Sequence, residues 1–269
     1  MFLPSTIDIE KSEKYVLSIR ILPSGLQFAI SDPDNGKNYC LRQTTFVAES
    51  SILENLQRVI FELSFLSLEF KQTNVVFVTP SYDIVPITFF ETNFKEKTYE
   101  LVHHDKADKI LTNAIASQDI VMQYNVAKDC CDFLVRNLFN PSFFSHASLL
   151  IDFFENKGKA MGMNTKMVVN CHEGIFDILC YRNSRLIHCL SIEDDHYINQ
   201  VYYILKVWEE SNFDQLNDFI YLAGTYDEQV FIELNKYVKN VEVINAPHEV
   251  FLWNDEALKA PLDLLSLAL

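Results

Sequence analysis

The amino-acid sequence predicts an α/β protein built from two related halves, each combining a three-stranded antiparallel meander with parallel strands and flanking helices. Three observations support this fold class. The 269 residues are 49% hydrophobic, which is enough to bury cores in two domains of ordinary size. The same order of strands and helices occurs twice along the chain. Glycine and proline are scarce, at 6 and 8 residues, which argues against long structureless segments.

The first half opens with three predicted strands and a helix. Apolar and β-branched residues fill the segments 15–22, 26–31 and 38–45, with tight turns at Gly25 and at the Asn-Gly pair 35–36. In the helix that comes next, apolar residues recur at spacings of three and four, and Ser51 with Glu54 predicts a capping box at its start. A mostly apolar run at 74–79 then predicts a buried strand, followed by a Tyr-Asp pair at 82–83.

The second half repeats this order of elements. Extended segments are predicted at 166–174, 175–181 and 185–191. A helix follows with one apolar face, made of Ile198, Val201, Tyr202 and Leu205. The strand 218–223 comes next and ends in Gly224, Thr225 and a second Tyr-Asp pair at 226–227.

Two landmarks align the halves and predict an internal duplication. Gly25 corresponds to Gly174 at an offset of 149 (174 − 25), and the two Tyr-Asp pairs correspond at an offset of 144 (226 − 82). The longer Asn-Gly turn of the first half absorbs part of the difference. We expect Gly25 and Gly174 to supply the positive φ of a tight hairpin turn.

The halves differ after the Tyr-Asp pair. The first half carries a polar-rich insertion near 84–118, a strand at 120–124 and two further helices. The second continues with a helix at 229–239, a strand at 241–244 and a last amphipathic helix near 255–267. With the linker placed at 156–164, the predicted domains are residues 1–158 and 159–269.

This arrangement resembles the actin-like ATPase superfold, the fold of sugar kinases, heat-shock chaperone ATPases and cell-division and pilus-assembly ATPases, whose two halves are RNase-H-like. The chain also looks like an uncharacterised bacterial family of unknown function assigned to that fold. The resemblance implies a nucleotide cleft, where the first hairpin of each half offers an Asp and a Gly-rich turn. Backbone amides of that turn hold phosphate, and the carboxylate acts on Mg²⁺ or water.

The sequence departs from this pattern at both hairpins. The first reads Leu22-Pro23-Ser24-Gly25, which has no Asp, and Pro23 removes an amide donor. The second reads Asn170-Cys171-His172-Glu173-Gly174, and a single glycine precedes Thr225 at the expected adenosine turn. We therefore predict a degenerate nucleotide site without catalytic residues. Its cleft residues would be Ser24, Gly25, Asn170, His172, Glu173, Gly174, Gly224 and Thr225.

Charge and motif content exclude several function classes. With 22 basic and 37 acidic residues, the net charge of −15 disfavours binding to nucleic acid and to anionic membrane surfaces. The sequence contains no GxSxG, Walker A, GxGxxG or HExxH motif. The N-terminal residues do not resemble a signal peptide, and no apolar run has the length of a membrane span. We expect a cytoplasmic protein.

The six cysteines are interpreted as small buried hydrophobes. They form no CxxC pair, and Cys171, Cys180 and Cys189 fall on three successive predicted strands. A zinc site from these cysteines with His172 and His188 is the alternative, but the spacing lacks a close pair. We expect no bound metal.

Two functional hypotheses remain open at the sequence level. The first is a non-catalytic scaffold or regulatory protein that needs no cofactor and acts through an unknown protein partner, with specificity in the insertion. The second is an ATP/Mg-binding switch or kinase-like protein that uses non-standard cleft residues. The sequence does not identify the partner, the pathway or the oligomeric state.

Overall fold

The computed structural model describes residues 3–104, 106–158, 165–172, 174–244, 250 and 252–269. The chain divides into two compact units, residues 1–150 with 247–269 (unit 1) and residues 151–246 (unit 2). The predicted halves were 1–158 and 159–269. The described residues of the C-terminal segment thus group with the first unit, whereas the sequence assigned them to the second.

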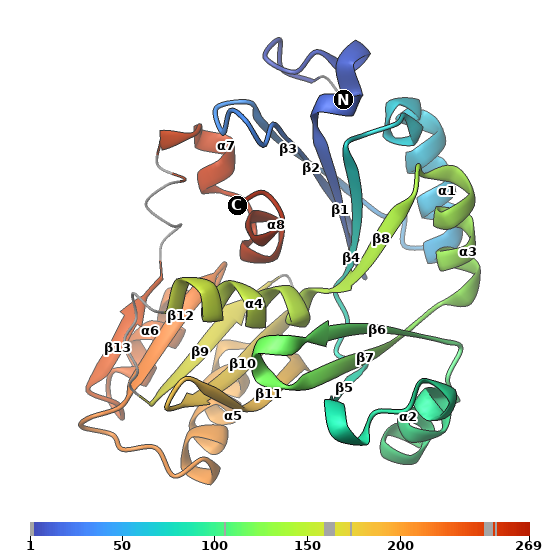
Figure 1. Cartoon of the computed structure of the whole chain (residues 1–269). Coiled ribbons are helices and arrows are strands. Elements are labelled where there is room, and N and C mark those ends of the chain that lie inside the picture. The colour runs from blue at the N-terminus through green and yellow to red at the C-terminus, as the bar shows by residue number, and fades with distance from the viewer. Residues whose placement is uncertain (1–2, 105, 159–164, 173, 245–249, 251) are drawn as a thin grey trace. The chain divides into compact units, whose positions relative to one another are not determined.

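Unit 1 contains a five-stranded mixed sheet in the order β3-β2-β1-β4-β8 (Figure 1). Its strands are β1 (Val16–Leu22), β2 (Gly25–Ser31), β3 (Tyr39–Thr45), β4 (Gln72–Phe77) and β8 (Pro141–Ser145). The central strand β1 is antiparallel to β2 and parallel to β4, and all of its residues are buried. Helices α1 (Ile52–Glu62) and α3 (Lys128–Asn137) lie on one face of this sheet, and α8 (Leu262–Ser266) lies on the other (Figure 1).

The predicted capping box at the start of α1 is confirmed. The Ser51 Oγ atom accepts a hydrogen bond from the Glu54 backbone N–H at 3.2 Å, and the Glu54 carboxylate accepts one from the Ser51 N–H at 2.7 Å. Two N–H groups that the helix cannot satisfy internally are satisfied in this way. Short 3₁₀ turns also occur in this unit, at Ile9–Lys14, Ser64–Ser67, Ile87–Phe89, Thr92–Phe94 and Ala116–Gln118.

The predicted insertion contributes to a separate three-stranded antiparallel sheet in the order β5-β7-β6. Its elements are β5 (Tyr82–Pro86), α2 (Lys95–His103), β6 (Lys109–Ile115) and β7 (Ile120–Val126). Asn113 on β6 ties this sheet to the end of β8. Its Nδ2 donates to the Phe143 carbonyl at 2.9 Å, and its Oδ1 accepts from the Ser145 N–H at 2.8 Å.

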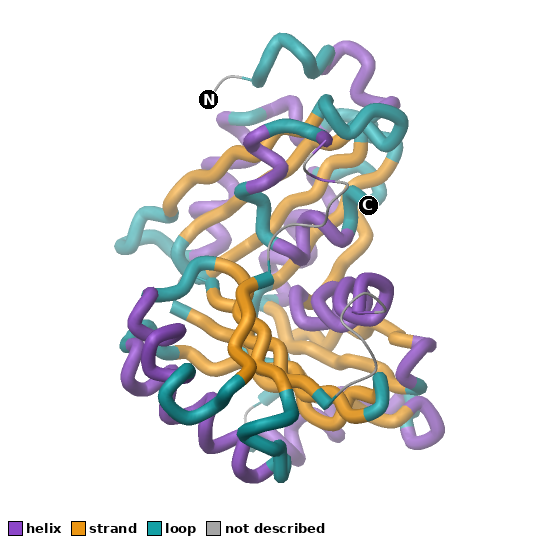
Figure 2. The backbone as a smooth tube through the Cα atoms, turned by 90° about the vertical axis from the view of Figure 1, so that its left-hand side faces the viewer, coloured by secondary structure: helices purple, strands orange, loops and turns teal. Residues whose placement is uncertain are grey.

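Unit 2 repeats the sheet of unit 1, with the order β11-β10-β9-β12-β13 and the same strand directions. The strands are drawn in orange in Figure 2. The prediction of two halves with one topology is thus confirmed. Its elements are β9 (Lys166–Cys171), β10 (Ile175–Arg182), β11 (Arg185–Glu193), α5 (Tyr197–Glu210), β12 (Phe219–Gly224), α6 (Glu228–Leu234) and β13 (Asn240–Val243). Helix α4 (His146–Gly158) begins in unit 1 and continues into unit 2.

One face of the unit 2 sheet forms a hydrophobic core with α5 and α6. Val169 on β9 and Ile178 on β10 pack there with Trp208 from α5 and Leu234 from α6. Because side chains alternate along a strand, the residues between these core positions point to the opposite face. That opposite face carries the polar side chains described below.

The predicted last helix is in fact two short helices, α7 (Asp255–Leu258) and α8. Pro261 separates them, because a proline disfavours helical backbone at the residue before it. Side chains of this segment hold the edge of unit 1. The Glu256 carboxylate accepts from the Leu41 N–H at 2.8 Å, and Asn254 Nδ2 donates to the Tyr39 carbonyl at 2.7 Å.

Among the helices that the structure describes, none is both long and apolar enough to span a bilayer.

Candidate functional site

The second hairpin, β9–β10, holds a buried polar cluster around Asp177. The Asp177 side chain is fully buried, and its carboxylate lies within hydrogen-bond distance of side chains of Asn170, His172 and Ser191 in unit 2. Asn170 Nδ2 donates to Oδ2 at 3.1 Å, Ser191 Oγ donates to Oδ1 at 2.5 Å, and His172 Nε2 lies 2.5 Å from Oδ2. We call these four residues the Asp177 cluster.

Strand register explains why these four residues meet. Asn170 on β9 and Ser191 on β11 both lie directly opposite Asp177 on β10, so the three side chains form a row across three strands. His172 follows Asn170 by two residues and therefore returns to the same face. The row lies on the face opposite the hydrophobic core of this sheet.

The arrangement fixes the chemistry of the Asp177 cluster. A carboxylate that accepts several hydrogen bonds is stabilised in its charged form, which compensates for burial. His172 Nε2 lies within hydrogen-bond distance of both Asp177 Oδ2 and Asn170 Nδ2, and the ring tautomer decides whether this nitrogen donates to the carboxylate or accepts from the amide. His172 and Asp177 are also of the residue types that bind divalent metals.

The predicted adenosine turn lies beside this cluster. Gly224, the last residue of β12, pairs with Cys171 and has a φ of 77°. A Cβ atom at this position would lie 2.1 Å from the Cys171 carbonyl oxygen, so only glycine fits. The Thr225 N–H donates to the same oxygen at 3.0 Å. Gly224 and Thr225 are thus held next to the end of β9.

The structure therefore brings together four of the predicted cleft residues in unit 2, namely Asn170, His172, Gly224 and Thr225. Gly174 has the expected positive φ, at 74°. Glu173 lies outside the described residues. Ser24 and Gly25 belong to the other unit, so the structure does not group them with the Asp177 cluster.

The expected role of Gly25 was wrong. Gly25 is a residue of β2 paired with Leu22 and with Thr45, and the positive-φ glycines of the described residues are Gly174 and Gly224. A Cβ on Gly25 would lie 2.4 Å from the Thr44 carbonyl oxygen. Glycine is required there because β3 approaches closely, whereas the two-residue turn is made by Pro23 and Ser24.

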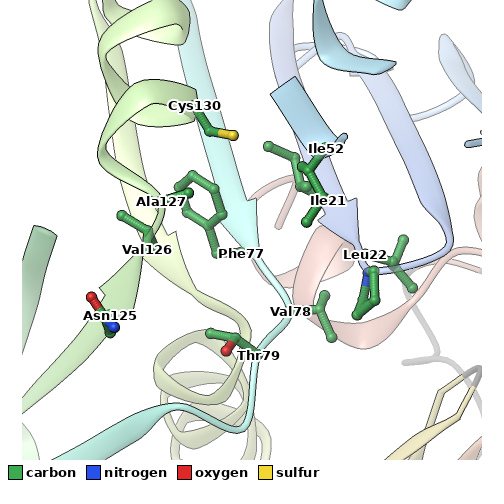
Figure 3. A pocket seen from close by; sticks show the side chains of 11 residues that line it. Ile21, Leu22, Ile52, Phe77, Val78, Thr79, Asn125, Val126, Ala127 and Cys130 are labelled. Carbon is green, nitrogen blue, oxygen red and sulfur yellow. The ribbon is translucent and has the colours of Figure 1, made fainter. Parts of the chain in front are cut away.

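A pocket of about 170 Å³ lies directly beside this first turn (Figure 3). Its lining comes from the ends of β1 and β4, the start of α1 and the junction of β7 with α3. The lining residues are Ile21, Leu22, Pro23, Ile52, Phe77, Val78, Thr79, Asn125, Val126, Ala127 and Cys130. We call it the first-hairpin pocket.

Sequence reasoning missed Asp177, Ser191 and the first-hairpin pocket. Asp177 stands alone among apolar neighbours in the segment Ile175-Phe-Asp-Ile-Leu179, and a charged residue inside a buried strand was the available signal. Ser191 carried no comparable signal, because its pairing with Asp177 depends on strand register.

Comparison with protein families gives a match over residues 4–241 to the family described as "Protein of unknown function (DUF3822)". The chain belongs to this family. A comparison with curated proteins gives no match.

Solved structures show which fold this DUF3822 chain has. It is similar to a Bacteroides thetaiotaomicron protein described as having an actin-like ATPase fold and unknown function, with 25% identity, a TM-score of 0.83, and coverage of 97% of this chain and 98% of the other. It is also similar to a structure of the PilM-PilN type IV pilus biogenesis complex, with 12% identity, a TM-score of 0.57, and coverage of 94% and 97%. The fold is thus the actin-like ATPase fold, as the resemblance implied.

Proposed function

We propose that this protein is a non-catalytic scaffold or regulatory protein that acts through contacts with another protein. The observation that carries the proposal is the first-hairpin pocket beside Pro23 and Ser24. In the actin-like fold this turn is the place where the resemblance puts a phosphate-binding carboxylate and amide donors. Here the adjoining surface is made largely of aliphatic and aromatic side chains.

This surface is chemically unsuited to phosphate. A phosphoryl group needs backbone N–H groups, cations or a metal to balance its charge, and it loses hydration when it meets apolar side chains. Ile21, Phe77 and Val78 offer none of these partners. In the second hairpin, the Asp177 carboxylate is engaged by Asn170 and Ser191 of its own sheet.

Exposed apolar side chains on the insertion support the protein-contact part of the proposal. Phe89 is 78% exposed and Leu101 is 76% exposed, and Phe94 and Val102 lie near them in the chain and are also exposed. Exposed apolar side chains favour association with a partner. The cysteines, all within the described residues, are free, which agrees with the reducing cytoplasm as the proposed location.

A second candidate function is a nucleotide-binding switch that uses the residues of unit 2. It is favoured by the close approach of Gly224 to Cys171 and by the position of Thr225 beside the Asp177 cluster. In this alternative, ATP/Mg would be the cofactor, held by non-standard groups such as Asn170 and His172.

Phosphate release from ATP with Mg²⁺, measured for the full chain and for Asp177→Asn, tests the proposal. We expect the full chain and the variant to release phosphate at the same background rate. A Mg²⁺-dependent rate that the variant loses, while it keeps its cooperative unfolding, would support the second candidate instead. Asp218→Asn is the matched control, because it changes an acidic residue of unit 2 that precedes β12 and lies outside the cluster.

A further inference from the structure

We propose that the first-hairpin pocket receives an aromatic side chain of a partner protein, and that basic residues flank this side chain in the partner. The inference rests on the proposed function. It specifies which kind of side chain a partner protein would place in the first-hairpin pocket, at the turn where the resemblance puts a phosphate site. It concerns unit 1 alone.

The pocket walls are formed by side chains from strands and helices of unit 1. Ile21 and Phe77 come from adjacent parallel strands, and the Cys130 side chain faces them from α3 (Figure 3). The Phe77 ring stacks on Phe143 at 6.1 Å between ring centres, which holds it in place. Ile52, the first residue of α1, is 45% exposed and marks the solvent side.

The volume of the pocket suits one ring. An engineered apolar cavity of about 150 Å³ in another protein binds benzene, so a pocket of this kind is large enough for a phenyl group. The first-hairpin pocket measures about 170 Å³. A charged or hydrogen-bonding side chain would lose its hydration here without gaining equivalent partners from Ile21 or Val78.

Cys130 adds to the apolar character of the pocket. Burial raises the pKa of its thiol from 9.0 to about 12, with the neighbouring Asp129 carboxylate acting in the same direction. The sulfur is therefore a neutral thiol at physiological pH and packs as a small, polarisable hydrophobic group. Such a surface favours contact with an aromatic ring.

The polar groups of the pocket suit a main chain entering with that ring. Asn125 Oδ1 accepts from the Asp108 N–H at 3.0 Å and from the Lys109 N–H at 3.3 Å. This fixes the amide so that its Nδ2 group is the end able to donate to a partner carbonyl. Thr79 contributes a hydroxyl to the same lining, with its Oγ1 fixed by the Ser81 N–H at 3.1 Å.

Acidic residues lie next to lining residues of the pocket, in the chain or through a hydrogen bond, and indicate the charge of the partner. Glu54 lies on the first turn of α1, Asp129 lies on the first turn of α3, and Asp108 caps the Lys128 N–H at 2.8 Å. All three carboxylates are on exposed residues, and Lys128 offsets one of them. The net charge of −15 also favours a positively charged partner. Basic residues beside the ring would therefore be attracted.

Three end-blocked tripeptides test this, with protein labelled at Ile, Leu and Val methyl groups and observed by NMR. We expect Lys-Phe-Lys to shift the methyl signals of Ile21, Ile52 and Val78 but not those of Val169 and Ile178 in the unit 2 core. Lys-Ala-Lys should bind about tenfold or more weakly, because it buries no ring. Glu-Phe-Glu should bind about threefold or more weakly than Lys-Phe-Lys, with the gap closing at high salt.

Two variants test whether these shifts arise from peptide bound in the first-hairpin pocket. Ile52→Asp places a charge at the opening and should abolish the shifts, whereas Ile198→Asp, at a 55% exposed position near the start of α5, should leave them unchanged. Both substitutions place an acid in the first turn of a helix, where it is tolerated.

Several outcomes would overturn the inference. These are the absence of pocket shifts with Lys-Phe-Lys, equal shifts in the Ile52→Asp variant, and equal binding of Lys-Ala-Lys. Equal binding of Glu-Phe-Glu would remove the basic flank from the proposal. Mg²⁺-dependent phosphate release would instead overturn the non-catalytic function and leave the peptide result unaffected, so the two failures are distinguishable.

Discussion

Arg20 on β1 donates from Nε to the Asp263 carboxylate on α8 at 2.7 Å, and both side chains are almost completely buried, with 2% and 0% exposed. The Arg20 Nη1 group also donates to Gln27 Oε1 at 3.1 Å. The pair joins the central strand of unit 1 to a helix 243 positions later in the chain. It is therefore a buried, charged link between the described part of the C-terminal segment and the first sheet.

Removing one partner of this pair should destabilise the protein strongly. We expect Asp263→Ala to lower the free energy of unfolding by about 3–5 kcal/mol, because the buried Arg20 loses the carboxylate that balances its charge. Urea unfolding measures this, and Asp255→Ala, an exposed acid on α7, is the control, with an effect of about 0.5 kcal/mol or less. The double variant Arg20→Met, Asp263→Leu should recover most of the loss. A loss no larger than that of the control would contradict this account.

Two glycines should respond differently to alanine. Gly174→Ala meets no atom within 4 Å but keeps a φ of 74°, and we expect a loss of about 1–2 kcal/mol. Gly224→Ala has the same kind of backbone strain and also brings a Cβ to 2.1 Å from the Cys171 oxygen, so its loss should be about 3 kcal/mol or more. Thermal unfolding of the two variants compares them directly. Equal losses of unfolding free energy would mean that the backbone at Cys171 moves away from the added Cβ at no energetic cost.

The Asp177 cluster should contribute to the stability of unit 2. Asp177→Asn removes the charge shared by Asn170, His172 and Ser191, and we expect a loss of about 2–3 kcal/mol. Ser191→Ala removes one donor and should cost about 1 kcal/mol. Hydrogen exchange of the β9 and β10 amides gives the local readout. Unchanged protection in Asp177→Asn would show that the cluster has no structural role.

Buried thiols should make the protein sensitive to alkaline pH. Burial raises the pKa of Cys171 and of Cys180 from 9.0 to about 12. The folded state therefore keeps protons that the unfolded state releases. The stabilisation is fully present below pH 9 and is lost as pH rises through about 12. We expect the unfolding midpoint to fall over this range and the fall to be shallower in Cys171→Ala. The half-exposed Cys189→Ala variant should retain the full slope.

Much of the fold could be predicted from local patterns. The periodicity of the helix after Ser51, the alternation in the two meanders and the two Tyr-Asp landmarks depend only on neighbouring residues, and they gave the correct order of strands. The break between α7 and α8 also follows from a local rule, because a proline disfavours helical backbone at the residue before it. The apolar periodicity of residues 255–267 nevertheless led to the prediction of a single helix.

Contacts between residues far apart in the sequence could not be predicted from such local patterns. The pairing of Asn170 and Ser191 with Asp177 depends on the register of three strands, which a one-residue shift would change. The return of Asp263 to Arg20 joins the two ends of the chain, and nothing near either residue in the sequence indicates its partner. The close approach of β3 to Gly25 likewise exists only once the sheet has formed.

Thermal unfolding of the full chain with and without millimolar ATP, ADP and Mg²⁺ tests the central claim, that the fold is used for its surface and not for nucleotide chemistry. A ligand that binds the native state must raise the melting temperature. We expect the same melting temperature in all conditions. A rise of several degrees with ATP or ADP, lost in Gly224→Ala relative to Gly174→Ala, would contradict it and identify the turn at Gly224 as a nucleotide site.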